Sequence, residues 1–133
     1  GRRINDAMAF YVAGQIKKLM TNKKINLAKA NVLIMGFTFK ENCPDIRNTK
    51  IADLVYKISK FSPRVDIYDP WANKNEVKIE YNIDLIDKPI KGKYKAIIIA
   101  VAHDKFKKQS RKYLKSLVKK NHIIYDLKRV IST

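Results

Sequence analysis

The segment Asn31-Val-Leu-Ile-Met-Gly-Phe37 is the strongest indication of the fold class, because it is a continuous apolar run closed by a glycine. Such a run is typical of a β-strand buried on both faces, as in a parallel sheet. The pattern before it is different: apolar side chains between residues 4 and 21 recur every three or four positions, which predicts one long amphipathic helix. Its apolar positions are Ile4, Met8, Tyr11, Val12, Ile16 and Leu19. Residues 21–30 are polar and lysine-rich and predict a linker or a frayed helix end.

Three segments downstream share the composition of the first strand. They are residues 64–69, 95–102 and 122–126, and each is short, apolar and rich in β-branched side chains. We expect all three to be strands of the same sheet.

The segments between these strands predict helices. One follows a cap at Asn48 or Thr49, and another begins at Ser110. Residues 71–94 are ambiguous, and one interpretation places a short strand around Val77–Glu80.

Strands that alternate with helices predict a doubly wound α/β fold with a mostly parallel, Rossmann-like sheet. We assign this domain to residues 31–133. The long amphipathic helix and its linker, residues 1–30, precede it and are expected to lie outside it.

The chain carries a large positive charge, since 29 Lys and Arg residues stand against 12 Asp and Glu residues, a formal charge of +17. A basic nucleic-acid-binding domain is therefore one hypothesis. Base-reading proteins use arginine for guanine and place exposed aromatic rings among the basic residues. Here 23 of the 29 are lysines, scattered from Lys17 to Lys128. We favour a solvated lysine coat and expect no nucleic-acid partner.

Cysteine usage and hydropathy bear on metal binding and on the cellular compartment of the chain. The single cysteine, Cys43, excludes a disulfide framework, and with two histidines it leaves a zinc site unsupported. No apolar run approaches the roughly 18 to 20 residues that cross a bilayer, and no signal-peptide pattern opens the sequence. We therefore expect a cytoplasmic chain with no metal and no membrane partner.

Polar residues follow each predicted strand, and parallel strands gather these residues along one edge of the sheet, where ligands bind. The segments are Thr38–Arg47, Asp69–Trp71, His103-Asp104 and Asp126–Arg129. The first loop lacks the G-x-G-x-x-G pattern of dinucleotide sites and contains only Gly36. NAD or FAD is therefore disfavoured in this domain, whereas a nucleotide or sugar diphosphate held by Lys40 and Arg47 stays open.

Several residues in these loops admit a structural interpretation beside a functional one. Asp45 and Arg47 stand close enough to pair and brace the loop. Cys43 precedes a proline and has neither flanking glycines nor a helix start beside it that would activate its thiol, so we expect a structural or incidental role. His103-Asp104 is adjacent in sequence, and neighbours seldom join side chains, so we interpret it as a strand-end turn with a helix cap.

The run Gly36-Phe-Thr-Phe-Lys-Glu-Asn-Cys-Pro-Asp-Ile-Arg-Asn-Thr-Lys50 resembles the signature loop of the UDP-glucose/GDP-mannose dehydrogenase family, in its C-terminal UDP-binding domain. Other segments match in the family's order and cover nearly the whole chain: Gly1-Arg-Arg-Ile-Asn-Asp6, Tyr68-Asp-Pro70, Ala100-Val-Ala-His-Asp104 and Asp126-Leu-Lys-Arg-Val130. The form of the loop is similar to the bacterial branch that oxidises UDP-N-acetylglucosamine and UDP-N-acetylgalactosamine for surface polysaccharides.

The resemblance implies a cytoplasmic enzyme that oxidises the sugar C6 alcohol to a carboxylate, with two hydride transfers to NAD and a cysteine that forms a covalent intermediate. In that family the NAD domain and the catalytic cysteine precede the segment matched here. We expect this chain to be a piece of a longer protein, because it opens at Gly1 inside a predicted helix. We place no catalytic residue in it and expect no turnover from it alone.

The resemblance also implies site residues, position by position. Lys40 matches the lysine that reaches the sugar-phosphate part of the substrate, and Phe39 is its neighbour in the nucleotide-sugar site. Lys128 falls where many members have arginine near the substrate, a substitution that keeps the charge and loses the planar fork. Arg2 matches an arginine at the family's dimer interface that can complete the partner's site.

The remaining implications concern the loop and the first helix. Asp45 and Arg47 match the acid and base that brace the loop. The apolar face of helix 4–21 would serve a homodimer, and the alternative is that it packs back on its own sheet. Two other hypotheses stay open: a basic nucleic-acid-binding domain and a stand-alone nucleotide-binding module.

Overall fold

The computed structural model describes residues 2–109 and 111–128, and for residues 2–6 it describes the backbone alone. Four parallel strands form one sheet in the order β2-β1-β3-β4. In chain order the elements are α1 (Arg2–Asn22), β1 (Asn31–Met35), α2 (Ile51–Phe61), β2 (Arg64–Tyr68), α3 (Lys74–Tyr81), β3 (Tyr94–Ile99), α4 (Asp104–Lys107), α5 (Arg111–Leu117) and β4 (Val118–Asp126). The predicted α/β class and parallel sheet are confirmed.

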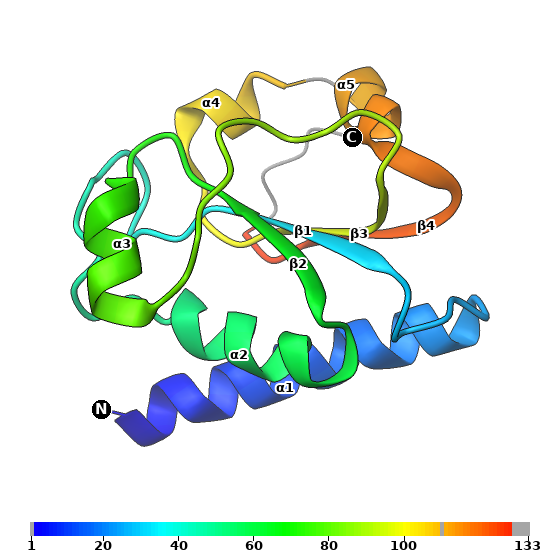
Figure 1. Cartoon of the computed structure of the whole chain (residues 1–133), viewed down its shortest axis with the longest axis horizontal. Helices are drawn as coiled ribbons and strands as arrows, with labels where there is room; N and C mark the ends of the chain where they lie inside the picture. The colour runs from blue at the N-terminus through cyan, green and yellow to red at the C-terminus, as the bar shows by residue number, and fades with distance from the viewer. Residues whose placement is uncertain (1, 110, 129–133) are drawn as a thin grey trace.

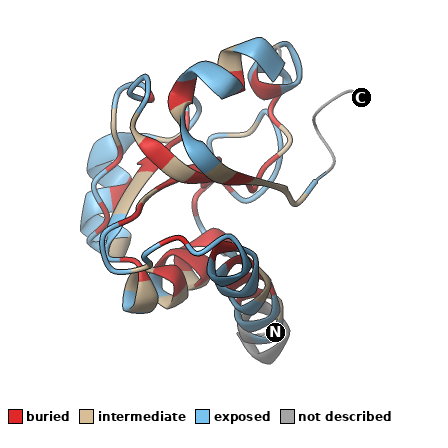
Figure 2. Cartoon of the chain, turned by 90° about the vertical axis from the view of Figure 1, so that its right-hand side faces the viewer, coloured by how far each residue is buried: buried red, intermediate tan, exposed pale blue. Residues whose placement is uncertain are grey.

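Helices cover both faces of the sheet (Figure 1), because the strand side chains alternate between two apolar clusters. On β1, Val32 and Ile34 belong to the cluster between the sheet and helices α1 and α2. Leu33 and Met35 belong to the cluster between the sheet and helices α4 and α5. Figure 2 shows this burial as two buried layers, one on each side of the sheet. A strand that is buried on both faces must be apolar at every position, which explains the continuous run at residues 31–35.

Helix α1 belongs to the larger core cluster, in contrast to the expectation that residues 1–30 lie outside the domain. Its buried face consists of Ala9, Val12, Ala13, Ile16 and Met20, all at most 5% exposed. Alanines at this face let α1 approach α2 closely, so the buried stripe is rotated from the one that the larger side chains predicted. Two residues of that predicted stripe, Tyr11 and Leu19, are exposed instead.

Residues 74–81 form helix α3, so the interpretation of a short strand around Val77–Glu80 was wrong. The Asn73 side chain caps the helix by accepting a hydrogen bond from the Glu76 N–H at 3.0 Å. Asn82 ends it in the left-handed conformation, at φ 57°. These local caps stabilise a short helix in which Val77 is buried and Ile79 is exposed.

The other boundaries are close to those predicted. Lys50 occupies the position before α2, and the neighbouring Thr49 hydroxyl accepts from the Ile51 N–H at 3.2 Å. Strand β4 begins at Val118, earlier than the predicted residue 122. Ser110, the predicted helix start, lies outside the described residues. No helix in the described part of the chain is both long and apolar enough to span a membrane.

The two edge strands of the sheet differ in their surroundings. Along β2, Leu85 forms an isolated parallel bridge with Ile67, and the Ile86 N–H donates to the Ile67 carbonyl at 2.9 Å. Along β4, the first residues include exposed Lys119 and Lys120.

The ends of β1 and β3 approach each other at Gly36. This residue adopts φ 103°, and a Cβ there would lie 2.6 Å from the Val101 Cβ and 2.7 Å from the Val101 nitrogen. Glycine is therefore required both by the backbone conformation and by the space. The close approach brings the loop after β1 against the residues that follow β3.

We expect Gly36→Ala to destabilise the chain by at least about 2 kcal/mol, because it adds strain at positive φ and a clash with backbone. The measurement is urea unfolding followed by circular dichroism. Gly14→Ala is the matched control: Gly14 lies in α1, and a Cβ there meets nothing within 4 Å. That change should stabilise by up to about 1 kcal/mol. Equal effects of the two substitutions would contradict the role of Gly36.

Candidate functional site

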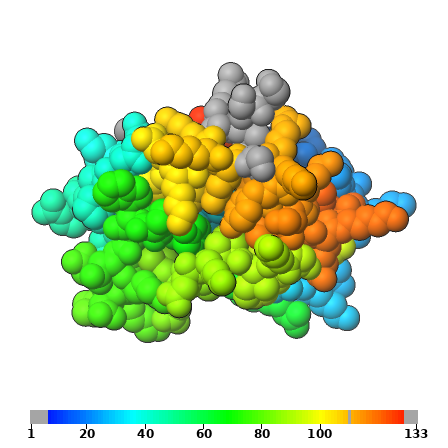
Figure 3. Space-filling model, turned by 90° about the horizontal axis from the view of Figure 1, so that it is seen from above, coloured from blue at the N-terminus to red at the C-terminus, as the bar shows by residue number. Residues whose placement is uncertain are grey.

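The loops that follow the four strands meet at the carboxyl edge of the sheet. Since β1 lies between β2 and β3, the loop after β1, residues 38–48, is flanked by Asp69 after β2 and His103 after β3. The space-filling view in Figure 3 shows this loop, coloured cyan, against the α4 segment, coloured yellow. The site is therefore built from segments far apart in sequence.

The carboxylate of Asp69 joins three of these segments. Its Oδ2 atom accepts hydrogen bonds from the backbone N–H groups of Phe37 at 2.6 Å and Thr38 at 3.0 Å. Its Oδ1 atom accepts from the N–H groups of Trp71 at 2.7 Å and Ala72 at 3.2 Å. The side chain is fully buried, so these bonds replace the water that the charge has lost.

His103 provides a further hydrogen bond to this carboxylate and contacts the first loop as well. Its Nε2 atom lies 2.9 Å from Asp69 Oδ2, and its Nδ1 atom accepts the Asn42 N–H at 2.9 Å. An Nδ1 that accepts cannot carry a proton, so the network assigns the proton to Nε2, which donates to Asp69. The imidazole is 0% exposed and packs near the rings of Trp71 and Phe106.

The environment of Asp69 favours its ionised form. Burial raises the pKa of the carboxyl, but hydrogen bonds from His103 and from the Phe37 and Thr38 N–H groups outweigh burial and hold that pKa below its ordinary value. A carboxyl with a lowered pKa stabilises the fold at neutral pH and loses this contribution as the pH falls.

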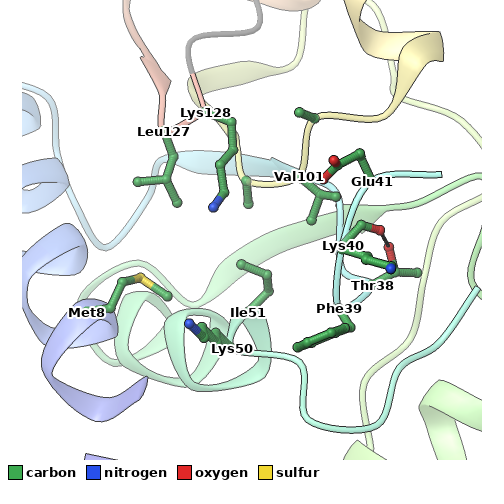
Figure 4. A pocket seen from close by; sticks show the side chains of 12 residues that line it. Met8, Thr38, Phe39, Lys40, Glu41, Lys50, Ile51, Val101, Leu127 and Lys128 are labelled. Carbon is green, nitrogen blue, oxygen red and sulfur yellow. Dashed lines mark hydrogen bonds between the residues drawn. The ribbon is translucent and has the colours of Figure 1, made fainter. Parts of the chain in front are cut away.

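A pocket of about 200 Å³ opens beside this network. Its walls come from α1, from the first loop, from the start of α2 and from the residues after β3 and β4. Figure 4 shows Lys128 reaching into it from the end of β4, opposite Met8 and Lys50, with the ring of Phe39 along another wall. The lining residues are Met8, Thr38, Phe39, Lys40, Glu41, Lys50, Ile51, Ala100, Val101, Ala102, Leu127 and Lys128.

Three of the predicted substrate-binding residues therefore share one pocket: Phe39, Lys40 and Lys128. Phe39 is 50% exposed, unlike Phe37, which is buried in the core against Tyr81. Trp71 is 43% exposed but does not line this pocket. Among the described residues, the lining contains three lysines, Lys40, Lys50 and Lys128, and one acidic residue, Glu41, so the pocket suits an anion.

The other predicted residues lie elsewhere. Asp45 and Arg47 form a two-pronged pair, with Nε to Oδ1 at 3.1 Å and Nη2 to Oδ2 at 3.2 Å, outside the lining of this pocket. The Arg47 side chain is 82% exposed, and its hydrogen bond lowers the pKa of Asp45. The side chain of Arg2 lies outside the described residues.

Cys43, His103 and His122 are not among the described residues that line the pocket. Cys43 carries a free, half-buried thiol and does not line the pocket. Within residues 2–109 and 111–128, no group of three or more His, Cys, Asp or Glu side chains could hold a metal ion. His103 starts α4 at the cap position without a side-chain cap bond, because its ring nitrogens serve Asp69 and Asn42.

The sequence places Asp69 and His103 at strand ends but does not predict their contact with each other, and it does not predict Lys50 as a site residue. Asp69 and His103 lie 34 residues apart and meet because their strands flank β1. The available signal was topological: two polar residues that end the strands on either side of the first loop. The role of Lys50 is not visible in the sequence, because Lys50 directly precedes a helix for which Asn48 and Thr49 are the better cap candidates.

Comparisons with known proteins identify a family for this chain. The family model described as "UDP-glucose/GDP-mannose dehydrogenase family, UDP binding domain" matches residues 33–133. The UDP-N-acetyl-D-glucosamine 6-dehydrogenase of Salmonella typhi is 48% identical over 131 residues, which is 98% of this chain and 31% of the relative. The protein of the same name from Pseudomonas aeruginosa is 44% identical over the same share.

A solved structure supports the fold independently. The UDP-D-ManNAc dehydrogenase of Pyrococcus horikoshii superposes with a TM-score of 0.78 at 27% identity, covering 98% of this chain and 29% of that one. The chain thus spans about a third of the length of the relatives it matches.

We expect Asp69→Asn to cost about 3 kcal/mol at pH 7, because an amide hydrogen would face backbone N–H groups that now meet oxygen. The difference from the unaltered chain should shrink as the pH falls below about 4, because the carboxyl of the unfolded chain then binds a proton while the lowered pKa keeps the folded carboxyl ionised to a lower pH. Urea unfolding between pH 2 and 7 measures both. Asp87→Asn, at a carboxyl whose side chain is 85% exposed, is the control and should change stability little. A gap that stays constant with pH would contradict the ionised state of Asp69.

Proposed function

This chain belongs to the UDP-glucose/GDP-mannose dehydrogenase family as its UDP binding domain, and from that premise we propose that the carboxyl-edge pocket binds the nucleotide sugar of a UDP-N-acetylhexosamine 6-dehydrogenase. The observation that carries the proposal is the convergence of Lys40, Lys50 and Lys128 with the exposed ring of Phe39. The parent enzyme would oxidise the sugar C6 alcohol to a carboxylate for surface polysaccharide precursors.

The pocket has the chemistry that a UDP-sugar requires. A diphosphate carries two or more negative charges, and lysine ammonium groups neutralise such charge with charge-assisted hydrogen bonds. The ring of Phe39 offers a flat apolar surface to a base or a sugar face. The Asp45–Arg47 pair lies in the same loop and would brace it, and Arg2 would complete a partner's site.

The residues after β1 do not fit a dinucleotide. A pyrophosphate approaches a glycine-rich turn closely, but the open side of Gly36 is occupied by Val101, whose Cβ would lie 2.6 Å from a Cβ added at that glycine. We therefore assign NAD to a part of the parent protein outside residues 1–133, together with the catalytic cysteine.

We propose a cytoplasmic location for the parent enzyme and no nucleic-acid or membrane partner.

We also propose that the parent enzyme is a homodimer joined through α1. Outside its buried face, α1 exposes Phe10 by 74%, at the edge next to Lys57 of α2, and Tyr11 by 62%. Exposed aromatic rings on a helix favour protein contact because they bury large apolar area at low entropic cost.

UDP binding tests the proposed function directly. Addition of UDP to the 15N-labelled chain should shift the amide signals of residues 38–41 and 127–128 in two-dimensional NMR spectra. Lys40→Ala and Lys128→Ala should each weaken binding about tenfold, the expected loss of one charge-assisted hydrogen bond.

Two controls accompany this titration. Lys115→Ala removes an exposed lysine of α5 that does not line the pocket, and should leave the affinity unchanged. Uridine lacks the diphosphate and should bind far more weakly than UDP. Shifts confined to other surfaces, or equal losses for all three lysine variants, would contradict the proposed site. Binding of unrelated DNA with a steep salt dependence would favour the nucleic-acid hypothesis instead.

Sedimentation velocity tests the dimer. The unaltered chain should associate with rising concentration, and Phe10→Asp should shift it to the monomer because a charge would be buried at the interface. Ile79→Asp is the matched control, since Ile79 is 84% exposed on α3. If the two variants associate equally, α1 is not the interface.

A further inference from the structure

The loop segment 38–42, which carries Phe39 and Lys40 into the pocket, is held at both ends by the buried network. At its start, the Thr38 N–H donates to Asp69 Oδ2 at 3.0 Å. At its end, the Asn42 N–H donates to His103 Nδ1 at 2.9 Å, and Asn42 Oδ1 accepts the Asp104 N–H at 3.0 Å. Residues 39–41 between these points are exposed.

The backbone conformation of Asn42 depends on its hydrogen bonds to His103 and Asp104. Asn42 adopts φ 53°, a left-handed conformation that costs energy for a residue with a side chain. The hydrogen bonds to His103 and Asp104 select that conformation, which turns the chain back toward the sheet edge. His103 itself is rigid, because it is 0% exposed between Trp71 and Phe106 and bonded to Asp69.

We propose that His103 is a positioning residue for nucleotide-sugar binding: its Nε2–H anchors the ring to Asp69, and its Nδ1 holds Asn42 so that Phe39 and Lys40 face the pocket. This inference rests on the proposed function and extends it to a residue that does not touch the pocket. It assigns separate consequences to the two ring nitrogens. The Nε2 atom, which lies 2.9 Å from Asp69 Oδ2 and 3.3 Å from the Thr38 hydroxyl oxygen, mainly supports the fold, and the bond from Asn42 to Nδ1 supports ligand affinity.

Two substitutions separate these nitrogens. The amide oxygen of Asn stands near the place of Nδ1, so His103→Asn keeps an acceptor for Asn42 and loses the donor to Asp69. The amide nitrogen of Gln stands near the place of Nε2, so His103→Gln keeps the donor to Asp69 and loses the acceptor for Asn42. If His103 is a positioning residue, the more stable of the two variants should bind UDP more weakly, and the less stable variant should bind UDP more tightly.

The experiment measures thermal unfolding and the UDP affinity, by NMR titration, of the unaltered chain and both variants. His103→Gln should be the more stable variant and should bind UDP about tenfold more weakly than the unaltered chain, with faster hydrogen exchange at the Asn42 amide. His103→Asn should be less stable, while its affinity stays within about twofold and its Asn42 amide stays protected. Affinity that falls in parallel with stability, lowest in His103→Asn, would overturn the proposal in favour of a purely structural histidine.

Lys40→Ala keeps this inference distinct from the proposed function. It should lower the affinity and leave Asn42 exchange slow. If Lys40→Ala weakens binding and His103→Gln does not, the function stands and the positioning role is wrong. If neither this chain nor the parent enzyme that contains it binds UDP, the proposed function fails and the role in binding fails with it. Should neither histidine variant fold, the 15N spectrum of the unaltered imidazole decides, since a proton on Nδ1 would overturn the proposal.

Discussion

The fully buried carboxylate of Asp69 is the constraint on which the carboxyl edge of the sheet depends. Removing a charge from water is costly, and here five hydrogen bonds offset that cost, four from backbone N–H groups and one from His103. The same bonds satisfy the N–H groups of Phe37 and Thr38, two residues that are at most 1% exposed. One side chain thus fixes the relative position of the segments that follow β1, β2 and β3.

The fold was largely predictable because its signals are local. The apolar run at residues 31–35 reflects burial on both faces, and the same composition located the other three strands. The failures also have local physical causes. Around Val77, the hydrophobic pattern does not distinguish a strand from a helix, and the caps at Asn73 and Asn82 favour the helix. On α1, the size of Ala9 and Ala13 determined which face packs, whereas apolar periodicity alone weights large side chains.

The candidate site was predictable where it depends on strand ends and on the loop motif. Phe39, Lys40 and Lys128 follow strands, and a shared edge brings such residues into one pocket. Asp69 and His103 could not be paired from the sequence, because their contact depends on which strands flank β1. In the sequence, the carboxylate next to His103 is that of Asp104, whereas the carboxylate that His103 contacts in the fold is that of Asp69. Contacts that depend on strand order are invisible to spacing rules.

The two edges of the sheet carry a consequence for assembly. An exposed edge strand offers unpaired N–H and C=O groups to another chain and invites aggregation. Along β2, the bridge from Leu85 and the bond from Ile86 occupy part of that edge. Along β4, Lys119 and Lys120 place positive charge where two such strands would pair, and like charges repel across that junction. The bridge at one edge and the positive charge at the other therefore both oppose growth of the sheet by strand addition.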